Sequence, residues 1–424
     1  MTNPPTPPRP ESVHIPRRTL LQGALAAGLL ASLPRASAAT SYASDEPEVK
    51  DVRLGIIAVE SCAPIVVAHE KGFFKKHGLV SSLSKEASWA TVRDKLMSGE
   101  NQATHMKYAQ PIGSTLGVLG AQKSGVVIPF TLSRNGSIFL VAKAIGSKLT
   151  FDPKAWKAHV EELKAKSETF TLALPLPFGW HGLMYRHFLA NGGINADKDL
   201  KVITLPPAQM LQNMRVGTMQ ACALVEPWGT RGVADGVTTI AMYGHELWPD
   251  HPVKALGVTA EFADKNPKTV KAMIRALHEA AAWCDAFENR EELARMLATP
   301  SYLNSPAPTI LPSLMGDFDW GDGRKKSDKS MAIAFNRDNH PQPREIQWFA
   351  AQFRRWGMVT GEPDYADVVK RVARADLYEA ALKELGATPH ARNDAPIRLW
   401  DGTVFDPSKP AEYGRAFAIH NRKD

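Results

Sequence analysis

The chain has 424 residues, of which 44% are hydrophobic and 22% charged, the composition of a soluble globular protein with two or three domains. The formal net charge is +7, and it falls to about +4 without residues 1–38, which hold four arginines and one glutamate. Basic and acidic residues are interspersed, which excludes a basic nucleic-acid-binding face. The three cysteines have no CxxC spacing, so a zinc site is excluded, while buried thiols or a disulfide plus a thiol both stay open.

The first fifty residues predict export. Arg17 and Arg18 precede an apolar run over residues 20–33, and small residues at 36–38 follow it. This order is typical of a twin-arginine signal peptide, here residues 1–38, with a flexible leader over 39–50. An apolar run of about 14 residues is shorter than a bilayer span, although retention of the signal as an anchor stays open. We therefore expect a periplasmic protein.

Strands and helices alternate after the leader. We expect strands over residues 52–59, 79–87 and 126–132, helices over 65–77 and 89–98, and an extended run over 138–142 after the turn Arg134-Asn135-Gly136. Glycines at 78 and 99 end the two helices. This order favours a parallel or mixed sheet with helices on both faces.

The stretch 169–194, TFTLALPLPFGWHGLMYRHFLANGGI, predicts a buried strand that leads into the N-terminus of a helix. Prolines and Gly179 interrupt the apolar run 170–174, and the helix opens at Trp180 and His181. The first amides of a helix have no partner within it, and the helix dipole is positive there, so this position suits a small anion. His181 can add a ring N–H, although a surface histidine without a ligand would give the same pattern.

A second α/β series surrounds that stretch, and helices follow it. We expect helices over 151–166 and 208–216, strands over 201–205, 221–225 and 238–242, and a break at the prolines of 249–252 that returns the chain to the first domain. From residue 266 onward the pattern is helical, with one long helix from Pro267, an apolar face over 346–356 and a last helix over 365–385. The predicted division is residues 51–146 and 251–424 in lobe 1 and residues 147–250 in lobe 2.

The sequence resembles the periplasmic nitrate- and bicarbonate-binding proteins of ABC importers, which belong with the taurine, sulfonate and thiamine-precursor binders. The resemblance is carried, in order, by LGIIAVESCAPIVVAHEKGFFKKHGL (54–79), KEASWATVRDKLMSGE (85–100), WHGLMYRHFLANGGI (180–194), PPAQMLQNMRVGTMQACALVEPW (206–228), HPVKALGVTAEFADKNP (251–267) and QWFAAQFRRWGM (347–358). It implies an α/β, two-lobed periplasmic-binding-protein fold of type II, with mixed sheets flanked by helices and a hinge between the lobes.

The resemblance also implies a site between the lobes, at Trp89, His181, Val225, Glu226 and Lys254. Trp89 offers a flat face and an indole N–H to a planar anion, and Lys254 supplies the charge that a desolvated anion needs. An ionised Glu226 would repel the anion, so we expect it to pair with Lys254. Nitrate binders of this kind tend to carry a glutamine near the Asn-Gly turn, where this chain has Ser137, whose shorter side chain can still donate one hydrogen bond to the ligand.

The expected ligand is nitrate or nitrite. Both anions only accept hydrogen bonds, which suits a lysine at position 254, whereas bicarbonate carries an O–H and its binders place an acid there and recruit a metal. Bicarbonate, cyanate and sulfonate stay open as alternatives. We expect a monomer that works with a membrane permease and an ATPase, without a cofactor or a metal. Three aspartates at 317–322 match an EF-hand loop only in part, since the position that needs glycine is Asp322.

Catalysis is not expected. The chain has no G-x-S-x-G, H-E-x-x-H or P-loop motif. The thiamine-pyrimidine synthesis enzymes that share the fold carry a cysteine-rich metal motif and act in the cytosol, in contrast to the isolated cysteines and export signal of this chain. A ligand-sensing regulator of nitrate assimilation is a further alternative, which the twin arginines disfavour.

Overall fold

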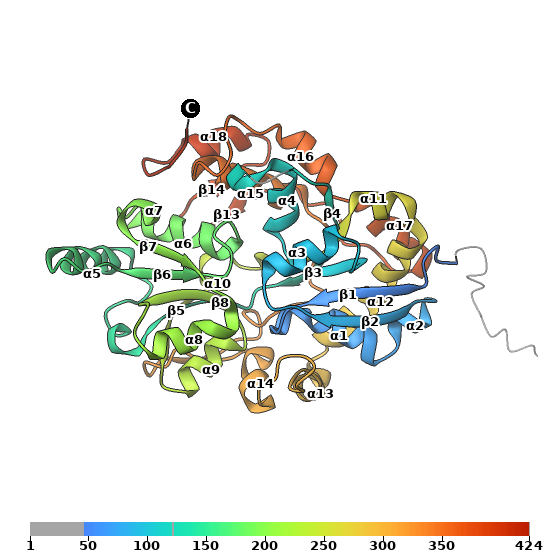
Figure 1. Cartoon of the computed structure of the whole chain (residues 1–424), viewed down its shortest axis with the longest axis horizontal. Helices are drawn as coiled ribbons and strands as arrows, with labels where there is room; N and C mark the ends of the chain where they lie inside the picture. The colour runs from blue at the N-terminus through green and yellow to red at the C-terminus, as the bar shows by residue number, and fades with distance from the viewer. Residues whose placement is uncertain (1–45, 121–122, 424) are drawn as a thin grey trace, which may run out of the picture. The chain divides into compact units, whose positions relative to one another are not determined.

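The computed structural model describes residues 46–120 and 123–423, which contain two five-stranded mixed sheets (Figure 1). The first sheet has the order β2-β1-β3-β10-β4 and the second has the order β7-β6-β8-β5-β9. In each sheet the first three strands are parallel, and a returning strand, β10 or β5, lies antiparallel beside them. The predicted fold class, two mixed sheets flanked by helices, is confirmed.

The strands of the first sheet are β1 (Asp51–Ile56), β2 (Val80–Lys85), β3 (Ala103–Lys107), β4 (Val126–Arg134) and β10 (Pro252–Thr259), and those of the second are β5 (Ser137–Ala142), β6 (Thr171–Leu174), β7 (Lys201–Thr204), β8 (Ala221–Val225) and β9 (Thr238–Tyr243). Two of them, β3 and β10, were not predicted from the sequence. β3 is buried at all five positions, so it lacks the alternation of polar and apolar residues that marks a half-exposed strand.

The helices that pack on the first sheet are α1 (Ala63–Glu70), α2 (Phe73–Lys76), α3 (Trp89–Met97), α4 (Ala109–Leu116), α11 (Ala260–Lys265), α12 (Pro267–Asp285) and α17 (Ala375–Leu385). The predicted helix over 65–77 is two helices, because Gly72 has a left-handed backbone (φ 73°) and starts α2. The predicted helix over 365–385 is also divided, into α16 (Tyr365–Val372) and α17, where Arg374 N–H donates to Ile128 O of β4.

The helices of the second sheet and of the C-terminal region complete the fold. The second sheet is flanked by α5 (Pro153–Ala165), α6 (Trp180–Asn191), α7 (Ala196–Asp199), α8 (Pro207–Arg215), α9 (Trp228–Ala234) and α10 (Gly244–Leu247). The later helices are α13 (Arg290–Leu297), α14 (Ala307–Met315), α15 (Pro343–Arg355) and α18 (Pro410–Arg415). Two short hairpins lie among them, β11 (Asp317–Asp319) with β12 (Lys325–Ser327) and β13 (Ile397–Arg398) with β14 (Val404–Phe405). The hairpin β11-β12 occupies the acidic stretch that partly matched an EF-hand loop.

The chain passes between the sheets at two places. It leaves β4 at Arg134, turns through Asn135 and Gly136, both with positive φ, and enters β5 at Ser137. It returns between Tyr243, the end of β9, and Pro252, the start of β10. The chain therefore crosses from the first sheet to the second at residues 135–136, and the lobe boundary between residues 146 and 147 stays a prediction.

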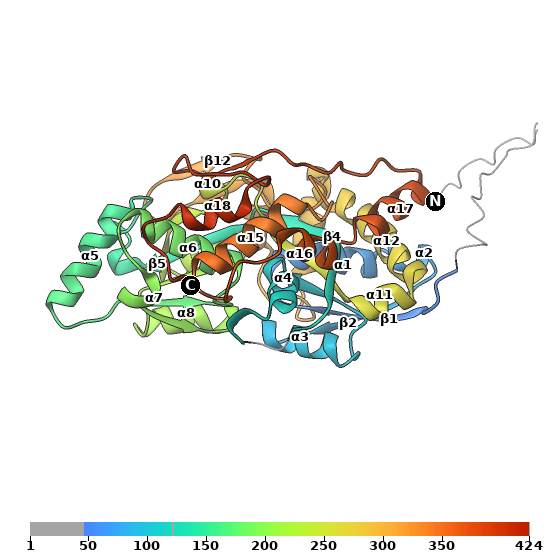
Figure 2. The same cartoon turned by 90° about the horizontal axis from the view of Figure 1, so that it is seen from above.

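Helix α15 connects the two halves of the molecule. In Figure 2 it lies between α6 and α4, and it packs directly against α4. Phe349 of α15 stacks on Tyr108, which precedes α4, while Arg355 Nη1 donates to His187 Nδ1 of α6 at 2.7 Å. His187 Nε2 also bonds Asp401 at 2.9 Å, which fixes the C-terminal segment to the same helix.

The described residues contain three cysteines, Cys62, Cys222 and Cys284, all free and buried, so the disulfide alternative is wrong. Across 46–120 and 123–423, none of the helices combines the length and the apolar character that a membrane span requires. The predicted signal peptide and the leader up to residue 45 lie outside the described residues.

Candidate functional site

Two buried lysines face each other at the centre of the first sheet. Lys107, the last residue of β3, is the antiparallel register partner of Lys254 on β10. Side chains at such positions lie on the same face of the sheet with Cβ atoms about 5 Å apart. The register against β4 shifts on either side of Lys254, and a bulge of this kind re-aims a side chain out of the regular pleat. The fold thus places two like charges side by side.

No described carboxylate compensates these charges. Lys107 is 3% exposed and Lys254 is 0% exposed, and neither forms an ion pair within the described part of the chain. Lys254 Nζ is buried without a hydrogen-bond partner. Burial lowers the pKa of Lys107 to about 7, and burial together with the charge of Lys107 lowers the pKa of Lys254 well below its ordinary value. Two unpaired ammonium groups in an apolar interior are costly, and a bound anion would offset that cost.

Trp89 lies against both lysines. Ser88 caps helix α3 by accepting a hydrogen bond from Thr91 N–H, and this cap sets Trp89 at the first helical position. The indole ring lies 4.9 Å from Lys107 Nζ and 5.2 Å from Lys254 Nζ, so both ammonium groups contact its π system. Its Nε1–H is buried and has no partner, so it is free to donate to a ligand.

The N-terminus of α6 brings His181 to the same place from the second sheet. Gly179 precedes the helix and has no side chain that could cap it. A Cβ at Gly179 would lie 3.3 Å from Lys107 Cδ, so the side chain of Lys107 passes close to the start of the helix. Lys107 Nζ lies 3.3 Å from His181 Nδ1. Burial and the two lysines lower the pKa of His181 well below its ordinary value, so the ring is neutral. An ammonium can only donate, so a charged Lys107 leaves the ring hydrogen on Nε2 of His181, which is buried without a partner.

We call these groups, Trp89, Lys107, His181 and Lys254, the lysine cluster. His105, two residues before Lys107 on the same face of β3, lies 5.5 Å from the Trp89 ring and bonds Ser61 Oγ through Nε2 at 3.1 Å. Burial and both lysines lower its pKa well below the usual value, so His105 is neutral as well. The two lysines are therefore the groups of this set that can carry a positive charge.

Val225 and Ser137 are register partners on β8 and β5 of the second sheet. Val225 belongs to the same apolar cluster as Trp89, together with Val253 of β10, so it forms part of the wall around the lysine cluster. The Ser137 hydroxyl is buried and has no partner. A Cβ on Gly244 would lie 2.8 Å from both Ser137 Cβ and His251 Nε2, which places the serine beside this histidine.

The expected ion pair between Glu226 and Lys254 is not formed. Glu226 instead accepts a hydrogen bond from Thr230 N–H at 3.0 Å, so its carboxyl group turns toward the start of α9. The cis peptide bond to Pro227 follows it, and its own N–H donates to Gly136 O. Burial raises the pKa of Glu226 to about 7, and its other carboxyl oxygen has no partner. The free amides at the start of α9 thus supply the donor for this carboxyl group.

Sequence reasoning missed Lys107, Trp180 and His251. His251 Nδ1 donates to Trp248 O at 2.9 Å, which leaves Nε2 as a bare acceptor, and its ring stacks on Trp180 at 3.9 Å. Trp180 also carries an unpartnered, buried indole N–H. The sequence signal for Lys107 was its position two residues after His105 in the run THMK. This spacing places both side chains on one face only if the run is a strand, and no strand was predicted there.

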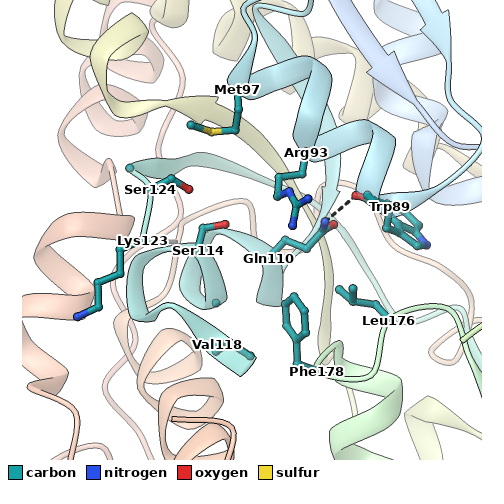
Figure 3. A pocket seen from close by; sticks show the side chains of 13 residues that line it. Trp89, Arg93, Met97, Gln110, Ser114, Val118, Lys123, Ser124, Leu176 and Phe178 are labelled. Atoms are coloured by element: carbon teal, nitrogen blue, oxygen red, sulfur yellow. Dashed lines mark hydrogen bonds between the residues drawn. The ribbon is translucent and has the colours of Figure 1, made fainter. Parts of the chain in front are cut away.

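An open pocket of about 650 Å³ lies on the other side of Trp89 (Figure 3). Its lining includes Arg93 and Met97 of α3, Gln110 of α4 and Phe178 of the loop before α6. Gln110 Nε2 donates to Trp89 O at 2.9 Å, and the indole ring points away from the pocket. Trp89 therefore borders both this open pocket and the two lysines, Lys107 and Lys254.

The chain is similar in sequence and in structure to known proteins. The sequence model of the NMT1-like family matches residues 45–298. The chain is 34% identical over 384 residues to the nitrate/nitrite binding protein NrtA of Synechococcus elongatus, covering 87% of this chain and 86% of that one. It is 32% identical over 390 residues to the bicarbonate transport ATP-binding protein CmpC of Synechocystis, covering 91% of this chain and 58% of that one. The crystal structure of the periplasmic nitrate-binding protein NrtA from Synechocystis PCC 6803 is similar at a TM-score of 0.84 and 31% identity, covering 88% of this chain and 100% of that one.

Proposed function

The chain belongs to the NMT1-like family, and we propose that it is the solute-binding protein of an ABC importer that captures a small inorganic oxyanion, nitrate or nitrite, between its two sheets. It binds its ligand and performs no catalysis. The ligand contacts are Trp89, His181, Val225, Ser137 and Lys254, with Glu226 holding the adjoining helix α9 in place. The relatives that bind nitrate and nitrite cover most of the chain, which supports this ligand class.

The observation that carries the proposal is the facing pair of Lys107 and Lys254, buried without a carboxylate. Beside it, the indole N–H of Trp89 and Nε2 of His181 are buried donors without partners, and the Ser137 hydroxyl next to His251 is a third such donor. Buried polar groups are nearly always hydrogen-bonded, so a cluster of unpartnered donors around two lysines supports an anionic acceptor at this place. A planar anion with three acceptor atoms fits such a set of donors.

Bicarbonate is the second candidate, because the chain also resembles CmpC, which has a role in bicarbonate transport. Bicarbonate carries an O–H and needs an acceptor, and His251 Nε2 is one unpartnered acceptor beside Ser137. Among the described residues of the site, the buried donors without partners outnumber the two such acceptors, His251 Nε2 and Glu226 Oε1, which favours nitrate or nitrite. The two ligands are distinguished by the anion panel described below.

Capture requires the two sheets to separate and close. The donors of the lysine cluster are sealed from solvent, so an anion enters only when the halves move apart. Two connections, 135–136 and 244–251, join the sheets, and Glu60 N–H donates to Glu226 O across the gap at 3.0 Å. Short connections of this kind act as hinges that absorb the backbone rotation. The ligand is then held by residues of both sheets.

The partners are a membrane permease and a cytoplasmic ATPase, in keeping with the similarity to an ATP-binding transport protein. The protein acts as a monomer in the periplasm, after export by the twin-arginine pathway. The arginine pair at 17–18 and the apolar run after it support this location. Recovery of the mature protein from a periplasmic extract, with residues 1–38 absent, tests it, and recovery from the cytoplasm would favour the sensor alternative.

We expect nitrate and nitrite to raise the melting temperature of the mature protein by several degrees at millimolar concentration. A ligand at a hundred times its dissociation constant stabilises the folded state by about 2.7 kcal/mol. The measurement is a thermal-shift panel of nitrate, nitrite, bicarbonate, cyanate, sulfate and taurine at constant ionic strength, with chloride as the reference. A shift with bicarbonate alone would assign the second candidate, and the absence of a shift with every anion would refute the proposal.

A further inference from the structure

We propose that Lys107 is a second cationic ligand of the bound anion and that anion binding loads a proton onto it. This inference rests on the proposed function and concerns the regulation of the same site. Lys107 was absent from the residues that the sequence and the family resemblance assigned. Lys107 lies opposite Lys254, contacts the Trp89 ring and bonds His181. Its ammonium group therefore lies among the buried donors that have no hydrogen-bond partner.

The surroundings of Lys107 contain no group that can neutralise it. Its own strand contributes His105, β10 contributes Lys254, and α6 contributes His181. Cys62 and His251 lie close enough to interact with Lys254, and the pKa of each is moved by burial toward its neutral form. The described part of the chain therefore gives Lys107 only neutral neighbours and one like charge.

The pair of lysines titrates as one system. Two like charges on facing residues of adjacent strands repel, so in the empty protein the second proton is held weakly. The pKa of Lys107 is about 7 because of burial, so the empty site is only partly charged at neutral pH. An anion between the lysines favours the charged form of both and raises the pKa of Lys107. Binding therefore takes up a proton wherever the pH lies above the pKa of the empty site and below that of the occupied one.

The contribution of Lys107 to anion affinity falls as the pH rises. Well below pH 7 Lys107 is already charged, and its contribution to affinity is complete. Above that pH each binding event must include proton uptake, so the contribution falls about tenfold per pH unit until the pKa of the occupied site is reached. The ratio of wild-type affinity to that of a variant without Lys107 is thus largest at low pH and shrinks as the pH rises.

The test compares the wild type with Lys107→Met, which keeps most of the side-chain volume and removes the charge. Isothermal titration with nitrate at pH 6.5, 7.5 and 8.5, in two buffers of different ionisation enthalpy that are effective at each pH, gives both the affinity and the number of protons taken up. We expect wild-type affinity about tenfold or more above the variant at pH 6.5, a smaller ratio at pH 8.5, and up to one more proton taken up by the wild type above pH 7. Lys75→Met, in exposed helix α2, is the matched control and should follow the wild type.

The results distinguish the role of Lys107 from the binding of an anion by the wild-type protein. Nitrate binding with the same affinity ratio at all three pH values, or with equal proton uptake in wild type and Lys107→Met, would overturn the role of Lys107 and leave the proposed function intact. Failure of every anion of the panel to bind the wild type would overturn both. Folding is checked by the melting temperature of each variant without anion, which we expect to be unchanged or higher for Lys107→Met, since an unpaired buried amine is removed.

Discussion

Replacement of Lys254 by methionine is expected to abolish anion binding while it raises the melting temperature of the anion-free protein. The lysine is fully buried and its Nζ has no partner, so in the empty state it costs free energy. In the occupied state it supplies the charge that offsets the desolvation of the anion. Removing one partner of a buried charge pair costs about 2–5 kcal/mol, so the affinity should fall by at least about 30-fold.

The two effects are measured on the same samples, by titration calorimetry with nitrate and by thermal melting without it. Lys75→Met controls for the loss of a positive charge at the surface. A Lys254→Met protein that binds nitrate as tightly as the wild type would show that Lys254 is not a ligand. A lower melting temperature without anion would show that this lysine stabilises the empty protein through some other contact.

Replacement of Arg134 by methionine is expected to lower the free energy of unfolding by about 3–5 kcal/mol. Arg134 ends β4, where the chain passes to the second sheet, and its Nη1 donates to Glu345 Oε1 of α15 at 2.6 Å. A second contact joins Nη2 to Asp338 at 3.2 Å. Both Arg134 and Glu345 are nearly inaccessible, so the substitution leaves a buried carboxylate without its counter-charge.

A double-mutant cycle measures this pair in urea unfolding. Glu345→Gln removes the negative charge and should lower the free energy of unfolding by less than Arg134→Met does, because the neutral amide can still form hydrogen bonds. The double variant Arg134→Met with Glu345→Gln should recover part of the loss, since no charge is then left unpaired. Additive effects of the two substitutions would mean that the contact at the sheet crossing contributes nothing specific to stability.

Much of the second sheet could be predicted because its sequence has strong local signals. The run 170–174 is apolar throughout, the prolines and Gly179 interrupt it, and the helix that follows begins at Trp180 as expected. Gly182 shows why the loop is so compact, since a Cβ there would lie 2.2 Å from Pro177 O. Such turns and helix ends depend on residues close in the sequence, and their chemistry is visible without a structure.

The site was harder to predict because its main feature depends on pairing between distant strands. Lys107 and Lys254 become neighbours only through the register of β3 and β10, and neither strand has a periodic pattern. The expected partner of Lys254, Glu226, bonds the start of α9. A sequence names which residues can carry charge, whereas a missing counter-charge becomes apparent only when every neighbour is known.

The position of β10 between β3 and β4 also constrains the order in which the two sheets form while the chain is being synthesised. All strands of the second sheet precede residue 244, so that sheet can assemble on a nascent chain while the first is still in two pieces. Synthesis of residues 252–259 joins those pieces and delivers Lys254 in the same step. Long-range pairings of this kind form slowly. Translation intermediates that end before this strand therefore lack both a continuous first sheet and the charge on which ligand capture depends.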